Sequence, residues 1–363
     1  MKIIIIGAGI SGLSLAFFLQ QKGHDVTVLE RDNIFESKRQ GFSLTMQSNT
    51  LKIFEEYNLL DEIYSLGNRS KRQIFYDHFG NILYENNNND NDRFNYPLPR
   101  QEIRRVFYSK LKENTVIFNV KVIDVIGNRV ITELEEYSGD YIIACDGLNS
   151  IIRNKYFPEI KLNDLALCNV YGITDLTLLE EKDRIIFNNT EVQVLDGYHR
   201  FFSKPFNQTK QMWELTWPDS FNAFYKKSYK ESLVLCQELI KTWPQWLQNF
   251  LNISKSEDII VHPLFDIDPT SIDFTNLPNN IILIGDSIHP MAPYIGLGAN
   301  ESIVDGYNLA KVLGLPDFNK DFYKEVVNRC KRSVLRSREN VKFYHTIDAI
   351  DKDKLWTFKK WKN

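Results

Sequence analysis

A glycine-rich turn close to the N-terminus limits the fold of this chain more than any other feature. Gly7, Gly9 and Gly12 follow the apolar run Lys2–Ile6 and precede a helical pattern, Leu13–Lys22. This spacing is typical of the dinucleotide-binding turn: the first glycine permits the tight bend, the second lets a pyrophosphate approach the backbone, and the third lets helix and strand pack closely. The pattern predicts a strand, a turn and a helix, with a nucleotide bound along Gly7, Ala8, Gly9, Ile10, Ser11 and Gly12.

A second strand and an acidic residue complete this unit. Gly23 ends the helical pattern, His24–Leu29 reads as a strand, and Glu30 follows that strand 18 positions after Gly12. An acidic residue about 20 positions beyond the turn binds the ribose hydroxyls of the adenosine half of a dinucleotide. The unit therefore predicts an adenine dinucleotide. It does not distinguish NAD from FAD, because both contain that half.

A similar segment lies far along the chain. Ile281–Ile284 reads as a buried strand, Gly285-Asp286 ends it, and a Pro- and Gly-rich loop leads to a helix that starts near Ala299. Gly296 and Gly298 have no Cβ, so their backbone N–H groups can approach a ligand closely. The helix N-terminus adds partial positive charge, and Asp286 would accept a hydrogen bond from a sugar hydroxyl.

The same arrangement occurs a third time between these two segments. The apolar run Tyr141–Cys145 ends in Asp146-Gly147, and a helix starts near Ser150. Asp146 and Ser150 would serve as helix caps, which explains the local shape but not its third occurrence. Arg100 begins another helical pattern, where its guanidinium would reach a phosphate. A solvated arginine at a helix start explains that position equally well.

The chain changes character after about Ile160. Strand-like runs dominate, Asp196-Gly197 between two of them is typical of a hairpin, and a helical pattern covers Ser228–Phe250. We expect an inserted antiparallel sheet with its own helix, a return to the first domain at Asn280, and a basic helical tail.

Composition and charge exclude several kinds of partner. The formal net charge of −3 gives no electrostatic reason to expect a nucleic acid or an anionic membrane. The four cysteines are scattered without metal-ligand spacing, which favours reduced thiols in a cytoplasmic protein and no metal. After the first strand–helix unit, no apolar run is long enough to span a bilayer. The Asn/Asp-rich stretch 86–92 is expected to form a mobile surface loop.

Taken in order, the three turns resemble those of the class A FAD-dependent monooxygenases. That family includes para-hydroxybenzoate and salicylate hydroxylases and the tetracycline-inactivating monooxygenases. The resemblance covers nearly the whole chain and implies an α/β fold. Its parts would be a Rossmann-like FAD-binding domain of the glutathione-reductase type, an inserted antiparallel β-sheet substrate domain and a C-terminal helix. The expected segments are 1–72, 99–158 and 279–335 for the FAD-binding domain, 73–98 and 159–278 for the substrate domain, and 336–363 for the helical tail.

The resemblance also implies a role for each turn. The first turn would hold the FAD pyrophosphate, Asp146-Gly147 would support FAD, and the loop after Asp286 would lie against the flavin ring. Many relatives have Gly-Gln-Gly where this chain has Gly296-Leu297-Gly298, so the backbone contacts survive here and the amide side chain is missing. The cofactor-binding residues implied beyond the first turn are Glu30, Arg31, Arg100, Asp146, Gly147, Gly285, Asp286, Pro293, Gly296, Leu297, Gly298, Ala299 and Asn300.

The implied activity is that of a monooxygenase. NAD(P)H would reduce FAD, O2 would add to it, and the flavin hydroperoxide would insert one oxygen into an aromatic or polycyclic molecule, by hydroxylation or Baeyer–Villiger chemistry. No catalytic acid or base is assigned, and His289 fits a structural role in its loop better than a catalytic one. Residues expected to line the substrate, which core packing explains equally well, are Met46, Tyr171, Arg200, Phe202, Trp213 and Pro293.

Three other functions are compatible with part of the sequence. A halogenase or an isoprenoid-type reductase would share the fold, but Trp213-Glu214-Leu215-Thr216-Trp217-Pro218 lacks the W-x-W-x-I-P spacing of such halogenases. A flavin-free, partner-binding protein would not need the intact loop from Gly285 to Asn300. A simple NAD dehydrogenase leaves the two later turns without a purpose. The choice between NADH and NADPH, the substrate and the oligomeric state are left open.

Overall fold

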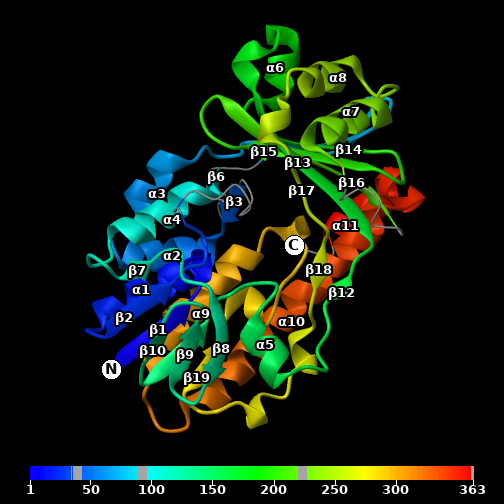
Figure 1. The fold of residues 1–363 in the computed structure, drawn as a ribbon. Coiled ribbons are helices and arrows are strands. Elements are labelled where there is room, and N and C mark those ends of the chain that lie inside the picture. Colours follow the sequence, from blue (N-terminus) through cyan, green and yellow to red (C-terminus); the bar gives the residue numbers. More distant parts are fainter. Residues whose placement is uncertain (34, 36–42, 88–95, 220–226, 361–363) are drawn as a thin grey trace.

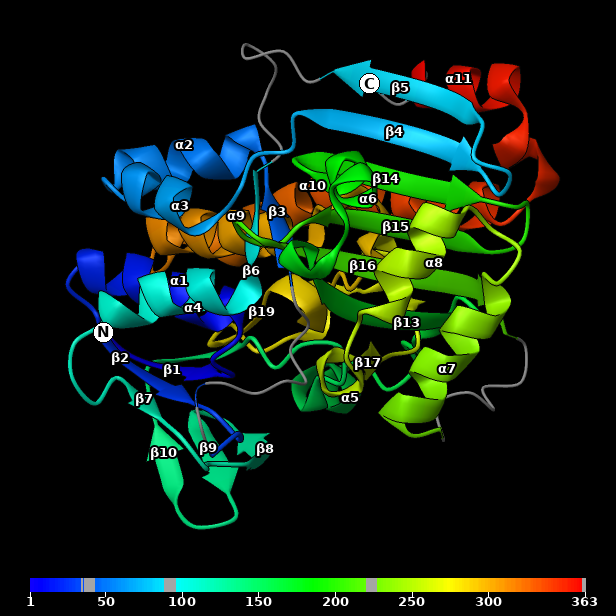
Figure 2. The same cartoon turned by 90° about the horizontal axis from the view of Figure 1, so that it is seen from above.

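The protein has two bodies, each built around its own sheet (Figure 1, Figure 2). The computed structural model describes residues 1–33, 35, 43–87, 96–219 and 227–360. The first body contains the N-terminus and a parallel sheet, and the second contains a larger, mostly antiparallel sheet. The Asn/Asp-rich stretch begins in strand β5, and the rest of it, residues 88–92, lies outside the described residues.

A five-stranded parallel sheet forms the centre of the first body, in the order β19-β11-β1-β2-β7. Residues of β1 pair with β2 on one side and with β11 on the other. Both faces are covered, so strands such as β1 and β19 are nearly continuous apolar runs, although β2 has polar residues at Asp25 and Thr27. The strands are β1 (Lys2–Ile6), β2 (Asp25–Leu29), β7 (Val116–Ile117), β11 (Tyr141–Ala144) and β19 (Ile281–Leu283).

Helices and a small sheet surround the parallel strands and share one apolar core with them (Figure 1). Helix α1 packs against α9 and α4, while the small antiparallel sheet has the order β10-β9-β8. These elements are α1 (Ile10–Gln21), α2 (Ser48–Glu56), α3 (Leu60–Leu66), α4 (Arg100–Ser109), α5 (Ile151–Tyr156), α9 (Gly298–Val312), β8 (Val122–Ile126), β9 (Arg129–Thr132) and β10 (Glu136–Ser138).

The second body is a seven-stranded sheet in the order β17-β13-β16-β15-β14-β4-β5. Neighbouring strands are antiparallel except for the pair β14 and β4, which is parallel because β4 enters from a distant part of the chain. The expected hairpin at Asp196-Gly197 joins β14 to β15. The strands are β4 (Arg72–Asp77), β5 (Ile82–Asn87), β13 (Leu167–Asp175), β14 (Thr190–Leu195), β15 (Arg200–Pro205), β16 (Lys210–Pro218) and β17 (Ile260–Val261).

Three helices cover the outer face of this sheet (Figure 2). They are α6 (Glu181–Phe187), α7 (Tyr229–Leu239) and α8 (Gln245–Asn252). The single helix expected over Ser228–Phe250 is wrong: Pro244, which caps α8, separates two helices, because proline cannot continue a preceding helix. Aromatic residues of the sheet and helices form the core beneath them.

Two further pairs of short strands form two-stranded sheets of their own. Strand β3 (Ser43–Met46) pairs with β6 (Tyr96–Pro99), and β12 (Asn163–Asp164) pairs with β18 (Phe265–Asp266). The expected substrate-domain segment 73–98 therefore supplies β4 and β5 to the large sheet but most of β6 to a ribbon with β3. That ribbon positions Thr45 against the large sheet, whereas Met46 lies in the core of the first body.

The chain ends in two helices. The long helix α10 (Phe318–Tyr344) runs through the boundary expected between residues 335 and 336, and a second helix, α11 (Lys352–Lys360), packs on β5. That boundary is wrong because no helix-breaking residue occurs there; the turn at 345–351 is where the tail separates from α10. Among the helices described, none has an apolar stretch long enough to span a bilayer.

Candidate functional site

The three turns identified in the sequence meet at one edge of the parallel sheet. Strands β1, β11 and β19 are neighbours and parallel, so the residues that follow them lie at the same edge. A Cβ on Gly7 would lie 2.6 Å from the Cys145 carbonyl oxygen, and one on Gly285 would lie 2.9 Å from Ser11 Oγ. Segments separated by more than 130 residues are therefore in direct contact.

The glycines of the first turn have different surroundings. Gly7 has a φ of +101°, and a Cβ on Gly12 would lie 1.9 Å from the Gly7 carbonyl oxygen, so packing and backbone geometry demand both. A Cβ on Gly9 would have no atom within 4 Å, and its φ of −71° suits any residue. The space beside Gly9 is open, as a site for a ligand requires.

Glu30 and a buried arginine hold this turn from both sides. Ala8 N donates to Glu30 Oε2 (2.7 Å), and the Ala8 carbonyl accepts from Arg104 Nε (3.1 Å) and Nη2 (3.0 Å). Arg104 is fully buried on α4, and burial lowers its pKa to about 10. The sequence reasoning missed Arg104; its position one helical turn after Arg100 was the available signal. Arg31, next to Glu30, is exposed.

Arg100 and Asp286 come together at the same edge. Arg100 is the first residue of α4, and its charge opposes the rise in the pKa of Asp286 that burial causes. Asp286 itself is accessible to solvent, although surrounding protein raises its pKa. Arg100 therefore lies close to the Gly285-Asp286 turn, although the two segments are far apart in the sequence.

The loop after Asp286 is tied to strand β3. Asn300 Nδ2 donates to the carbonyl oxygens of Thr45 (2.8 Å) and Gly296 (2.9 Å), and its Oδ1 accepts from Gln47 N (2.9 Å). Gly296 adopts the left-handed conformation (φ +63°), and helix α9 begins at Gly298. The Asn300 side chain therefore shapes the loop, leaving the backbone of 296–299 to face a ligand.

The middle turn caps helix α5, as expected, and also contacts the third turn. Asp146 Oδ2 accepts from Ile151 N (2.9 Å), and Ser150 caps helix α5 by accepting from Arg153 N (3.0 Å). Arg153 is buried and donates to the carbonyl oxygen of Ser287 in the third turn (3.0 Å). Helix capping thus explains the local contacts, while Arg153 braces one turn of the site against another.

The large sheet presents a polar face toward these turns. Arg200, Phe202 and Tyr171 share this face; Arg200 donates to Gln193 (2.8 Å) and Glu214 (2.8 Å). The Arg200 guanidinium lies between the rings of Phe202 (4.9 Å) and Tyr294 (4.3 Å). Because Tyr294 belongs to the loop after Asp286, this stack joins the large sheet to the edge where the three turns meet. Tyr294 was not among the residues expected from the sequence.

The structure separates Trp213 from the other residues expected near a substrate. Trp213 is fully buried in the core under α7 and α8, on the opposite face of the sheet from Arg200. Gly172 on the neighbouring strand leaves room for its indole. Met46 is buried in β3, and Pro293 is exposed at the start of the loop. Strand alternation, and not residue type, decides which of these faces the site.

Residues 1–186 and 275–316 match the model of a protein family described as FAD binding domain. The chain belongs to that family. It is similar to asperlicin C monooxygenase of Petromyces alliaceus (25% identity, covering 87% of this chain and 72% of the relative). It also resembles the chloroplastic zeaxanthin epoxidase of Oryza sativa subsp. japonica (24%, 85% and 48%), so it spans about half of that relative. A crystal structure of Klebsiella pneumoniae HpxO complexed with FAD and uric acid has a similar fold (TM-score 0.83, 20% identity, covering 100% of this chain and 93% of that one).

These findings confirm the family, the fold and the cofactor expected from the sequence. The protein is an FAD-dependent monooxygenase with a mixed α/β fold. The described residues are compatible with FAD on structural grounds as well, because the space beside Gly9 is open and the Asp286 side chain is exposed next to the buried Gly285. The matched segments also include the three turns, at residues 7–12, 146–150 and 285–300.

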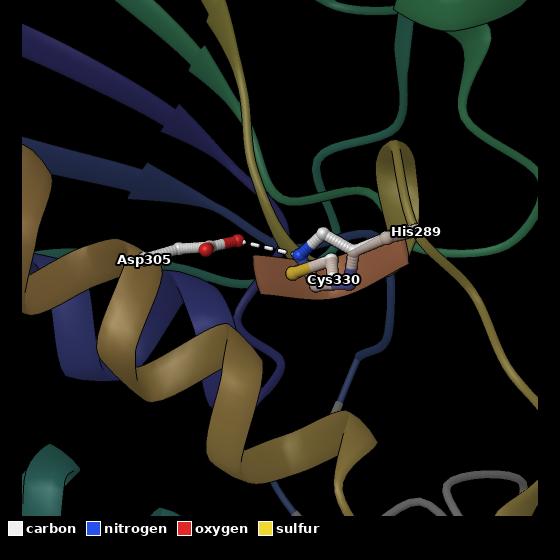
Figure 3. A group of neighbouring side chains, drawn as sticks. All are labelled: His289, Asp305 and Cys330. Atoms are coloured by element: carbon white, nitrogen blue, oxygen red, sulfur yellow. Dashed lines mark hydrogen bonds and ion pairs between the residues drawn. The ribbon is translucent and has the colours of Figure 1, made fainter. Parts of the chain in front are cut away.

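His289 of this FAD-dependent monooxygenase lies in a buried network beneath the third turn (Figure 3). Its Nε2 lies 2.7 Å from Asp305 Oδ2, and that carboxylate also accepts from Gly285 N (2.8 Å) and Arg329 (2.5 Å). Cys330 completes a cluster of metal-ligand types, but both Asp305 oxygens already accept hydrogen bonds, Oδ2 from Gly285 N and Oδ1 from Arg329. The contacts support the structural role expected for His289, which is to hold the Gly285 backbone.

Proposed function

We propose that the enzyme uses NAD(P)H and O2 to insert one oxygen atom into an aromatic or polycyclic small molecule. One observation carries the proposal: the edge where the three turns meet lies opposite the polar face of the large sheet, with Tyr294 stacked on Arg200 between them. A cofactor on that edge and a substrate on that face would be in contact. The insertion would be either a hydroxylation or a Baeyer–Villiger reaction.

The residues that would hold FAD come from all three turns and from helix α4. The backbone of residues 7–12 and the N-terminus of α1 would bind the pyrophosphate, with Glu30 at the adenosine ribose. Arg100 and Asp286 would contact the phosphate and ribityl region, and the backbone from Gly296 to Ala299 would face the ring. When bound, FAD supplies the chemistry with O2; the protein supplies orientation and exclusion of water.

The substrate would lie against the polar face of the sheet. Phe202 and Tyr294 offer flat apolar surfaces on either side of the Arg200 guanidinium, which suits a planar ring system. Tyr171 from β13 would close the site on a further side, and Pro293 would lie nearest the cofactor. Met46 was also expected here, but it is fully buried in the core of the first body, while its neighbour Thr45 faces the sheet. One similar protein is named for asperlicin C, and the crystal structure of another contains uric acid. Both molecules are ring compounds, which supports this substrate class.

Location and domain limits are part of the same proposal. We place the enzyme in the cytoplasm, because its four cysteines are unpaired and buried. The FAD-binding domain would comprise 1–72, 99–158 and 279 to the end of α10, and the substrate domain 73–98 and 159–278. The tail would then be the turn at 345–351 and helix α11.

Labelled oxygen tests the proposed reaction. Purified, FAD-loaded enzyme is screened with ring compounds for stimulated oxidation of NADH and of NADPH, and the hits are repeated under ¹⁸O2. We expect the product of at least one hit to carry one labelled oxygen atom. If every compound that stimulates NAD(P)H oxidation is recovered unchanged, with hydrogen peroxide as the oxygen product, the proposed insertion is refuted.

A further inference from the structure

One buried cation on the polar face of the sheet forms no ion pair with a described residue. Lys204 lies on β15, two residues after Phe202 and on the same face, whereas Phe201 packs on Phe250 in the core under the helices. The Lys204 side chain is only 7% exposed, and its Nζ donates to Thr45 Oγ1 on strand β3 (2.8 Å). No carboxylate of a described residue lies within 4.0 Å of that ammonium group.

The carboxylates nearest to Lys204 are already engaged. Glu191 accepts from Gln73 Nε2 (2.9 Å), and Glu214 forms an ion pair with Arg200 (2.8 Å). Burial lowers the pKa of Lys204 to about 8, and the more distant Glu191 and Glu214 oppose that change only in part. A buried, unpaired ammonium group is costly to keep, so its retention points to a ligand that compensates it.

Arg200 is not free to play that part. Its guanidinium donates to Gln193 and Glu214 and is stacked between Phe202 and Tyr294. Breaking the buried pair with Glu214 to reach another anion would leave a carboxylate unpaired. Among the residues that the structure describes, Lys204 is bound only to a neutral hydroxyl, so it can take an anionic ligand without breaking an ion pair with any of them.

Lys204 also lies close to the loop that we place against the flavin. Its partner Thr45 offers its carbonyl oxygen to Asn300, the side chain that shapes the loop. A Cβ on Gly296 would lie 3.7 Å from Thr45 Cβ. The ammonium group is therefore at the junction of the sheet, strand β3 and the cofactor loop, where a reacting substrate would be held.

A second buried lysine makes the same face more positive. Lys359 reaches from α11 to Gln73 Oε1 (3.0 Å) and lies over the rings of Phe75 and Tyr84. Burial lowers its pKa to about 8, as it does for Lys204. Gln73 also donates to Glu191. One carboxylate, that of Glu191, therefore lies near the two ammonium groups of Lys204 and Lys359, and this part of the face carries an excess of positive charge. Such a face favours an acidic ligand over a basic one.

We propose that Lys204 binds an anionic oxygen of the substrate, a carboxylate or an ionised ring hydroxyl, and so selects acids over uncharged molecules of the same shape. This inference rests on the proposed function, because it places the substrate on the face that Lys204 shares with Arg200. Lys204 is then a specificity-determining residue of the substrate site. Its ammonium would fix the acid next to the cofactor loop through a charge-assisted hydrogen bond.

The test compares matched acids and amides. Benzoate with benzamide, salicylate with salicylamide, and 2-naphthoate with 2-naphthamide are titrated into FAD-loaded enzyme, and the change in the visible flavin spectrum gives the dissociation constants. The variants are Lys204→Met, Lys204→Arg and the control Lys210→Met, whose lysine is half-buried at the hairpin end of β16. Reduction potentials of the substrate-free proteins are measured alongside.

We expect at least one acid to bind wild-type enzyme more tightly than its amide. Lys204→Met should weaken the binding of that acid by about 30-fold or more and leave the binding of the amide unchanged, because one partner of a buried charge pair is lost. Lys204→Arg should keep most of the preference, and Lys210→Met all of it. If Lys204→Met fails to fold, Lys204→Gln, which keeps a hydrogen-bond donor for Thr45, carries the same expectation.

Three results would overturn the inference. The first is a wild-type enzyme that binds no acid of the series more tightly than its amide. The second is equal weakening of acid and amide binding on loss of Lys204, which indicates a structural role. The third is a variant whose flavin potential shifts while its acid selectivity persists, which assigns the charge to the flavin. Binding is measured without turnover. Failure of the proposed oxygen insertion, seen as NAD(P)H oxidation without labelled product, is therefore a separate result.

Discussion

Alanine substitutions at Gly9 and Gly12 separate two roles that the same motif assigns to neighbouring glycines. At Gly9 the new methyl group would point into open space, and the backbone angles there (φ −71°, ψ −171°) suit alanine. At Gly12 the methyl group would lie 1.9 Å from the Gly7 carbonyl oxygen. The first change therefore acts on the ligand, and the second acts on the fold.

The magnitudes follow from these surroundings. Gly9→Ala should leave the FAD-free protein as stable as wild type or more stable by about 0.4–1 kcal/mol, because alanine restricts the unfolded chain. If the pyrophosphate occupies the space beside Gly9, the methyl group overpacks it by about 1–3 kcal/mol, which weakens FAD binding by about 5- to 150-fold. Gly12→Ala should lower the free energy of unfolding by about 3 kcal/mol, because backbone must move.

Two assays on FAD-free protein measure these effects. Denaturant unfolding gives the free energy of unfolding, and quenching of FAD fluorescence gives the dissociation constant. A Gly9→Ala protein that binds FAD as tightly as wild type would refute the placement of the pyrophosphate. A Gly12→Ala protein of wild-type stability would refute the close contact between helix and turn.

Four further substitutions test other parts of the account. Arg104→Met should lower the free energy of unfolding by about 3 kcal/mol, since two hydrogen bonds to the Ala8 carbonyl are lost. A variant whose melting temperature equals that of wild type would contradict this. Trp213→Ala should lower the free energy of unfolding, measured with denaturant, by about 3–5 kcal/mol without changing KM. A raised KM with unchanged stability would show that Trp213 contacts the substrate after all. Asn300→Ala should cost about 1–3 kcal/mol and weaken FAD binding, because strand β3 and the loop lose their clamp; unchanged FAD titrations would argue against it. Burial lowers the pKa of His289, but nearby Cys330 and Asp305 outweigh burial and raise it overall. Wild type should therefore be more stable than His289→Gln by its full margin below about pH 6.5, and this margin should decline as the pH rises through the raised pKa. A margin that grows with pH in unfolding experiments would contradict the buried ion pair.

The parts of the fold that depend on local sequence were predictable. Each turn combines a buried strand with glycine or aspartate at a fixed place, so Gly7, Asp146 and Gly285 could be located without a structure. That they would meet followed from parallel pairing, which places the ends of β1, β11 and β19 at one edge. Pro244 was visible in the sequence as well, but the apolar spacing on both sides of it hid the break between α7 and α8.

Contacts between distant segments could not be read in this way. The bond from Arg104 to Ala8 joins residues that are 96 positions apart, and no local pattern marks it. Arg200 was expected in the site, whereas its stacking partner Tyr294 comes from a loop 94 positions away. Trp213 looked as suitable as Phe202 by residue type; only the register of β15 and β16 shows that they face opposite sides of the sheet.

The visible absorption spectrum of the purified protein tests the central claim most directly, when it is followed by identification of the chromophore released on denaturation. The account predicts an oxidised-flavin spectrum and release of FAD in a ratio near one per chain. A colourless protein that also fails to take up added FAD would contradict the assignment of the three turns as a cofactor site.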